Sequence, residues 1–371
     1  MEGFSEIGDR INQKLVQNFS IENKIDMQLP VAEKLPVNLL AGCFNNTSAT
    51  YKYYWMLSIL QSVEKGNLKI SKKELFARMI SNAWFTVNYF RVSFGKQDLI
   101  QDAVRSINAI EKISIDENRE NVFKKLLATT NSETLKQLWH FNNNVPHWFL
   151  SPWFTQMGKA EIYFASKTFK SNCLYALHQD EIEINPEWKN YLTLNTRMLK
   201  DFCYWNLTLF LQAKNPNVPD IANKINKIIT RKNLTKQKNN FWKNVFDQEN
   251  YIECIFTKQK LYYNEKNYAL DHFVPHAFVS HDLVWNLIPI DKKFNIYKSD
   301  NLPELGKYFE RFFDVQKRAF TINKSINFQS TYMEEYLTIF KSLDDFSKDK
   351  FRETIQPLIT IASNNGFLFM K

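Results

Sequence analysis

The chain has 371 residues, of which 44% are hydrophobic and 15% aromatic, so it can bury a sizeable core and is not expected to be disordered. Its net charge of +9 favours an anionic partner without identifying one. It contains only 8 glycines, which argues against a doubly wound nucleotide-binding fold and for helices joined by polar loops.

The N-terminus, MEGFSE, lacks the charged-then-apolar order of a signal peptide. No apolar run approaches the roughly 18 residues that span a bilayer, so we expect a cytoplasmic protein with no membrane partner. The cysteines, at positions 43, 173, 203 and 254, are far apart and form neither a disulfide framework nor a paired zinc motif. We expect them to be reduced and mostly buried, with no structural zinc.

The first two-thirds of the chain has a helical pattern. Residues 51–63 are apolar on nearly every side, which predicts a buried helix. Ser71 and Glu74 have the spacing of a capping box at the start of a second helix, in which both side chains accept from backbone N–H groups. Further helices are predicted at 118–127, 132–141 and 195–213. Residues 215–220, NPNVPD, then end the helical region.

A basic stretch follows, with no acidic residue from 221 to 246. It is either a surface that contacts nucleic-acid phosphates or simply a solvated helix face. The candidate contacts are Lys224, Lys227, Arg231, Lys232, Lys236, Lys238 and Lys243.

From residue 251 to 303 the pattern changes to short strands and turns. Residues 251–256 and 287–290 have strand character, and the helical pattern returns after Pro303. The predicted fold class is therefore mainly α with a small α+β insert. The predicted domains are a helical, bundle-like region at 1–220 for recognition or partner binding, a basic segment with short strands at 221–303, and C-terminal helices at 304–371.

The segment at 251–303 also contains the residues that are candidates for catalysis and metal binding. His272, His276 and His281 fall within ten positions. A histidine can take a proton from water near neutral pH. A carboxylate and an amide oxygen, here from Asp271 and Asn295, can hold a hard divalent ion. On a strand, Asp271 and His272 would point to opposite faces, so that one could face the ion and the other the attacking water. Such groups suit phosphodiester hydrolysis.

The run ALDHFVPHAFVSHDLVWNLIPIDKKFNIYKSDNLP resembles the HNH, or ββα-metal, nuclease motif, and above all the HNH domain of the CRISPR RNA-guided DNA endonucleases. No gap is needed from Asp271 to Pro303. The resemblance implies two antiparallel strands and a helix around one ion, Mg²⁺ or Mn²⁺. It implies that Asp271 and Asn295 bind the metal and that His272 is the general base. Asn286 would hold the loop and orient His272, and Lys298 would approach the phosphate.

The sequence departs from the family pattern in places. The preceding CIFTK resembles the strand before many HNH motifs, but Lys258 stands where that pattern often has glycine. No cysteine pair flanks the motif. The resemblance covers about a seventh of the chain, and no RuvC-like or guide-binding segment is recognised, so an RNA guide is not implied. The regions on either side resemble stand-alone bacterial HNH proteins.

The sequence thus predicts a DNA endonuclease of bacterial restriction or anti-phage defence, working with a partner ATPase or sensor. Two alternatives stay open: an RNase or toxin nuclease, and a non-cleaving nucleic-acid or protein-binding module. His276 and His281 are expected at the surface or in support of the site. His140 and His147, among tryptophans, are expected in the core.

Overall fold

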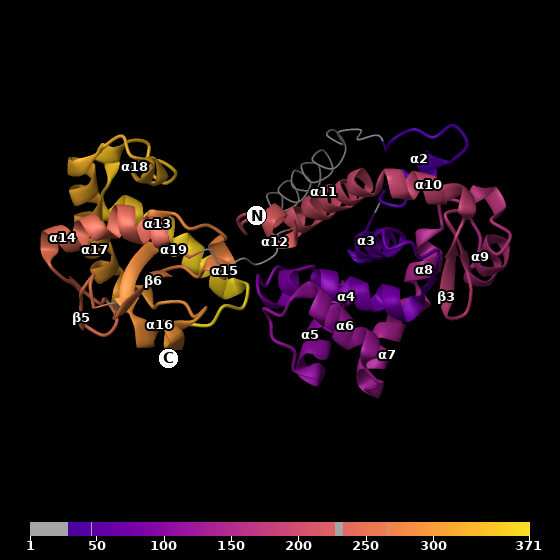
Figure 1. Cartoon of the computed structure of the whole chain (residues 1–371), viewed down its shortest axis with the longest axis horizontal. Coiled ribbons are helices and arrows are strands. Elements are labelled where there is room, and N and C mark those ends of the chain that lie inside the picture. The colour runs from indigo at the N-terminus through magenta and orange to yellow at the C-terminus, as the bar shows by residue number, and fades with distance from the viewer. Residues whose placement is uncertain (1–28, 46, 227–232, 266) are drawn as a thin grey trace, which may run out of the picture.

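The structure is a computed structural model that describes residues 29–45, 47–226, 233–265 and 267–371. It is mainly helical with small antiparallel sheets, which confirms the predicted fold class. Figure 1 shows the elements up to α12 on one side and those from α13 onward on the other. We call residues 29–226 the N-terminal lobe and residues 233–371 the C-terminal lobe.

The N-terminal lobe contains helices and a small three-stranded sheet of order β1-β3-β2. Its helices are α2 (Val37–Gly42), α3 (Tyr51–Val63), α4 (Lys72–Asn88), α5 (Leu99–Glu111), α6 (Arg119–Ala128), α7 (Ser132–His140), α8 (Val145–Phe149), α9 (Lys159–Ser166), α10 (Pro186–Leu194), α11 (Thr196–Lys214) and α12 (Ile221–Asn226). Short 3-10 turns lie at η1 (Phe141–Asn143) and η2 (Lys170–Asn172), and the strands are β1 (Lys69–Ser71), β2 (Tyr175–Leu177) and β3 (Glu181–Ile184).

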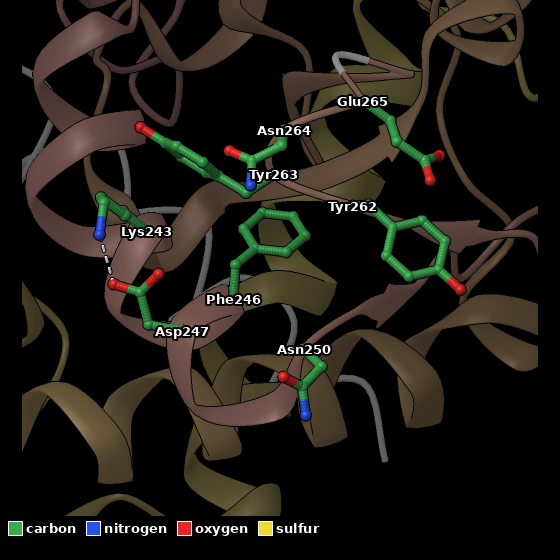
Figure 2. A pocket seen from close by; sticks show the side chains of 8 residues that line it. All are labelled: Lys243, Phe246, Asp247, Asn250, Tyr262, Tyr263, Asn264 and Glu265. Carbon is green, nitrogen blue, oxygen red and sulfur yellow. Dashed lines mark hydrogen bonds and ion pairs between the residues drawn. The ribbon is translucent and has the colours of Figure 1, made fainter.

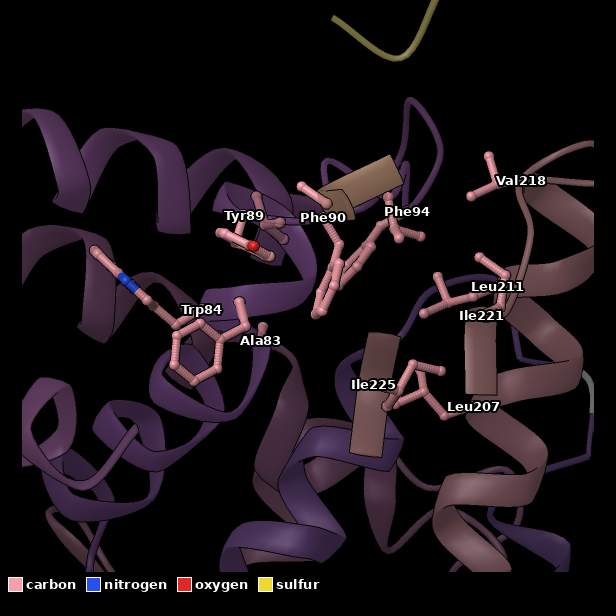
Figure 3. Packing of buried hydrophobic residues seen from close by; sticks show 14 of the residues in the cluster. Ala83, Trp84, Tyr89, Phe90, Phe94, Leu207, Leu211, Val218, Ile221 and Ile225 are labelled. Carbon is pink, nitrogen blue, oxygen red and sulfur yellow. The ribbon is translucent and has the colours of Figure 1, made fainter. Parts of the chain in front are cut away.

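The core of this lobe forms around α3 and α4. Trp55 on α3 and Trp84 on α4 are fully buried, because both helices carry apolar residues around most of their circumference. Figure 3 shows the side of this core where α4 faces residues of α11 and α12, among them Leu207 and Ile225. The predicted helices at 51–63, 118–127, 132–141 and 195–213 are all confirmed, within one or two residues at the ends.

The capping box at α4 is only half present. Ser71 Oγ accepts from Glu74 N at 3.1 Å, as predicted. The Glu74 carboxylate instead accepts from Ser62 and forms an ion pair with Arg78. The prediction that it returns to the helix start is therefore wrong, because two buried partners, Ser62 on α3 and Arg78 one turn later on α4, compete for the carboxylate.

The C-terminal lobe is built on two two-stranded sheets, β4–β5 and β6–β7, which helices surround. The elements are α13 (Thr235–Gln237), the π-helical turn η3 (Lys238–Trp242), α14 (Lys243–Glu249), β4 (Ile252–Glu253), β5 (Lys260–Leu261), β6 (Tyr268–His272), α15 (His276–Val279), η4 (Val284–Asn286), β7 (Leu287–Asp291), α16 (Lys292–Lys298), α17 (Leu305–Ile326), α18 (Thr331–Tyr336), η5 (Leu343–Asp345) and α19 (Lys348–Asn364).

The strand predicted at 251–256 is only two residues long. The chain turns after Cys254, whose carbonyl accepts from Lys258 N at 2.8 Å. Lys258 has a φ of 61°, in the left-handed region that favours glycine. This backbone conformation is the reason that the family pattern often has glycine here, and in this chain Lys258 adopts it.

Helix α17 packs against β7 and α14, so the helices after Pro303 share a core with the segment before it. The rings of Phe273, after β6, and Phe312, on α17, are stacked with centroids 3.9 Å apart. The three-part division of the chain at 220 and 303 stays a prediction.

The two lobes meet through cations of the N-terminal lobe. The Arg91 guanidinium donates to Gly366 O and lies 4.4 Å from the centre of the Phe367 ring. Lys224 Nζ donates to Phe278 O at 2.7 Å. All four cysteines are buried and free of disulfide bonds. In the described ranges, no helix is long and apolar enough to cross a bilayer.

Candidate active site

The antiparallel pair β6–β7 carries the predicted catalytic residues. Asp271 and His272 are the last two residues of β6, and they pair with Ile288 and Leu287 of β7. Because successive side chains on a strand point to opposite faces, the two groups diverge from adjacent positions. Asp271 points to α16, where it meets Lys298, and His272 points to the loop after α15, where it meets Asp282.

Asn286 fixes the turn that follows His272. It is fully buried, and its amide forms two hydrogen bonds with Val274: Oδ1 accepts from Val274 N and Nδ2 donates to Val274 O, both at 2.9 Å. Its backbone oxygen accepts from Phe273 N at 2.8 Å. Replacing any of these groups would leave a buried polar atom unpaired. Asn286 therefore holds the turn after β6, and its role in orienting His272 stays a prediction.

His272 is 9% exposed and lies among polar side chains of the same segment. Its Nε2 atom is 3.0 Å from Asp282 Oδ1, and the His276 ring is 5.1 Å away. Gln237 Nε2 donates to Asp282 O at 3.3 Å, which ties this loop to α13. A carboxylate in contact with an imidazole fixes the orientation of the ring and stabilises its protonated form.

Asp282 was not predicted from the sequence. It is the single acidic residue between Asp271 and Asp291, which is the signal that could have drawn attention to it. His281, next to it, is a poor proton carrier, since burial and then the charges of His272 and His276 lower its pKa to about 4.

Lys298 is placed differently from the prediction. Its side chain is 1% exposed, its Nζ lies 2.7 Å from Asp271 Oδ2, and it donates to His272 O at 2.8 Å. It therefore does not present its charge at the surface for a phosphate. Lys298 can be buried because the Asp271 carboxylate balances its charge and the His272 carbonyl accepts a hydrogen bond from it.

Asn295 is half-buried on α16, three residues before Lys298. Residues three apart share a helix face, so the face that carries Lys298 to Asp271 also carries Asn295. In the described ranges no cluster of three or more His, Cys, Asp or Glu side chains could hold a metal ion. The predicted ligand set is of another kind, one carboxylate and one amide. Both groups offer hard oxygens of the kind that a divalent ion takes, and their role as metal ligands stays a prediction.

The basic stretch is only partly a surface. Lys224 is wrong as a phosphate contact: it is 1% exposed, and its Nζ donates to the carbonyls of Pro219 and Phe278. Lys236 is exposed, and Lys238 and Lys243 are partly exposed. The others, Lys227, Arg231 and Lys232, lie outside the described residues.

His140 and His147 lie in the N-terminal lobe, away from β6 and β7 in the sequence and in the fold. His147 is buried, and burial, followed by the charges of Lys159 and Lys72, lowers its pKa to about 4. His147 is therefore a neutral core residue, as expected. His140 is exposed at the end of α7, so the expectation that it lies in the core is wrong.

Comparison with known proteins agrees with this geometry. The family model for HNH endonucleases matches residues 254–304, which include β6, β7 and α16. No match was found among curated proteins or among solved structures. Residues 254–304 are thus an HNH endonuclease domain, which confirms the resemblance predicted from the sequence and indicates nuclease activity in general.

Proposed function

We propose that this chain is a divalent-metal-dependent endonuclease that cuts DNA, with His272 as the general base. The observation that carries the proposal is the arrangement around the end of β6. There, His272 is bound to Asp282 on one face, Asp271 meets α16 on the other, and Asn286 holds the turn between them.

The chemistry of His272 follows from its partner. In a neutral imidazole one nitrogen donates and the other accepts. With Nε2 donating to Asp282 Oδ1 at 3.0 Å, Nδ1 holds the lone pair that takes a proton from water. The Asp282 carboxylate then stabilises the imidazolium ion, and the fixed ring orientation lowers the cost of reaching the reactive geometry.

Asp271 and Asn295 would hold a magnesium or manganese ion. When bound, such an ion stabilises the negative charge that develops on the scissile phosphate. Asp271 and Lys298 together set the electrostatics of this position, since the lysine balances part of the carboxylate charge at 2.7 Å.

The choice of DNA, and of a cytoplasmic role in bacterial restriction or anti-phage defence with a partner ATPase or sensor, rests on the resemblance to DNA-cutting HNH domains. The net charge of +9 is consistent with a polyanionic substrate. In this picture the N-terminal lobe recognises DNA or the partner, and the segment 254–304 cuts.

The test is cleavage of supercoiled plasmid in magnesium, manganese or EDTA, with wild type, His272→Ala and His178→Ala compared. His178 lies between β2 and β3 in the N-terminal lobe and serves as the matched control. We expect metal-dependent nicking that His272→Ala loses and His178→Ala keeps. An equal amount of structured RNA is assayed in parallel. Cleavage of RNA alone would assign an RNase, and metal binding without any cleavage would assign a non-cleaving module.

A further inference from the structure

A pocket of about 550 Å³ opens in the C-terminal lobe between α14 and the loop after β5 (Figure 2). None of its lining residues belongs to the active site described above. The residues that line it are Lys243, Phe246, Asp247, Asn250, Tyr262, Tyr263, Asn264 and Glu265.

The inside of the pocket combines flat rings with groups that form directional hydrogen bonds. Phe246 is buried and packs against Tyr263, with ring centroids 5.9 Å apart, while the Tyr262 and Tyr263 rings stay partly exposed. Asn250 and Asn264 bring amides to the same space, and both are exposed. Aromatic rings that stack and amides that read a polar edge are how proteins bind an unstacked nucleobase.

Lysines stand beside these rings. Lys238 Nζ is 5.7 Å from the centre of the Tyr263 ring and 4.6 Å from that of Tyr268. Lys243 Nζ is 5.8 Å from the Tyr263 ring and forms an ion pair with Asp247. Both lysines belong to the basic stretch singled out in the sequence, and together with the aromatic rings they match the cation–aromatic composition of single-strand binding surfaces.

The pocket is connected to the active site by one strand. The Phe246 ring contacts the ring of Tyr268 at 4.8 Å, and Tyr268 is the first residue of β6, while His272 is the last. Four residues of strand span about 13 Å, and residues an even number apart point to the same face. A nucleic-acid strand covers a distance of this order in a few nucleotides.

We propose that this pocket binds one unstacked nucleobase of the substrate strand, a few nucleotides from the scissile phosphate. Tyr263 supplies the stacking surface, the asparagine amides contact the edge of the base, and Lys238 attracts the adjoining phosphate. The inference rests on the proposed nuclease function and adds to it a sequence-sensitive contact outside the reacting centre.

The first experiment measures binding without cleavage. Full-length His272→Ala protein is titrated into single-stranded DNA that carries one fluorescent adenine analogue, in the presence of EDTA. Tyr263→Ala in the same background should weaken binding about tenfold and remove the fluorescence change, while Tyr263→Phe, which keeps the ring, should retain both. Phe328→Ala, which removes a ring that is 61% exposed just after α17 of the same lobe, is the matched control and should have no effect.

The second experiment measures cleavage of strands that carry a single abasic site at successive positions. For wild type, KM should rise about tenfold when the missing base is the one that occupies the pocket, a few nucleotides from the cut, and at the other positions much less. In Tyr263→Ala the same abasic strand should be cut no worse than the intact one. An abasic effect that persists in Tyr263→Ala, or binding that Tyr263→Ala leaves unchanged, overturns the proposal. If wild type cuts no nucleic acid, the proposed function fails, and the binding experiment still decides on the pocket.

Discussion

The Lys298 ammonium lies 2.7 Å from the Asp271 carboxylate, and the two side chains are 1% and 17% exposed. The pair links α16 to the end of β6, and the same ammonium donates to His272 O. The buried ammonium therefore holds α16 against the end of β6. Its loss would leave the Asp271 carboxylate without a compensating charge.

The first prediction concerns this pair. Lys298→Met should lower the free energy of unfolding by about 3–5 kcal/mol, because Asp271 and the His272 carbonyl both lose their buried partner. Denaturant titration followed by circular dichroism measures the change. Lys293→Met, which removes an exposed lysine from the same helix, should change stability by less than about 0.5 kcal/mol. Equal stability of Lys298→Met and wild type would contradict the structural role.

The second prediction separates cleavage from binding. Asp271→Asn keeps the size of the side chain and an oxygen that can still accept from Lys298, but it removes the negative charge, so we expect DNA cleavage in magnesium to fall by roughly a hundredfold or more. DNA affinity measured in EDTA should stay within about twofold of wild type. If cleavage and binding fall together, the role of Asp271 is to stabilise the fold of the segment, and it takes no part in the reaction.

The third prediction concerns Asp282, which contacts His272 Nε2 at 3.0 Å. Asp282→Asn can keep a hydrogen bond to the ring but cannot stabilise the imidazolium ion. We expect kcat to fall about 10- to 100-fold with KM nearly unchanged. Asp314→Asn, at an exposed position of α17, is the control. A rise in KM with no change in kcat would show that Asp282 acts on substrate binding instead.

The fourth prediction is a dependence of stability on pH. Burial raises the pKa of Glu335 to about 7, with the charge of Asp282 adding to the shift, although the carboxylate accepts from Val284 N at 2.6 Å. Because the folded-state pKa lies above the unfolded one, the folded protein binds more protons between them, and its stability should fall as pH rises from about 4.5 to about 7.

Urea titrations at about pH 5 and about pH 8 measure this contribution. Glu335→Gln should flatten the difference between the two conditions, because the group no longer titrates. Glu334→Gln, an exposed neighbour on α18, should leave the difference as it is in wild type. An unchanged pH dependence in Glu335→Gln would rule out Glu335 as its source.

The fifth prediction concerns the contact between the lobes. Burial lowers the pKa of Lys224 to about 7, yet its Nζ donates to Phe278 O, at the end region of α15. Lys224→Met should leave this buried carbonyl without its donor and cost about 1–3 kcal/mol. Amide hydrogen exchange at residues 276–282 should speed up more than exchange in β7. Uniform acceleration across the C-terminal lobe would show a global effect instead.

Much of the fold could be predicted because its causes are local. The helix α3 is apolar on nearly every side, and a run of that length and composition is compatible with few structures other than a buried helix. The short strand β7 was predicted in the same way, from a compact apolar run next to a turn. The HNH segment could be recognised because the residues of its motif lie close together in the sequence.

What could not be predicted depends on contacts between distant residues. A lysine in the last turn of a helix is normally solvated, and only packing against β6 turns Lys298 inward. Lys224 is buried because Phe278, 54 positions away, offers its carbonyl. Asp282 has no local pattern at all, and its place beside His272 follows from the path of the loop after α15.

Each lobe contains at least one buried cysteine, so the reactivity of its thiols can be used to detect when that lobe unfolds. Cys43, Cys173 and Cys203 lie in the N-terminal lobe and Cys254 in the C-terminal lobe. Burial raises the pKa of the three N-terminal thiols, that of Cys173 to about 12, so a native chain should resist alkylation. Timed labelling followed by peptide mass analysis would then show which half of the molecule opens first, without any engineered probe.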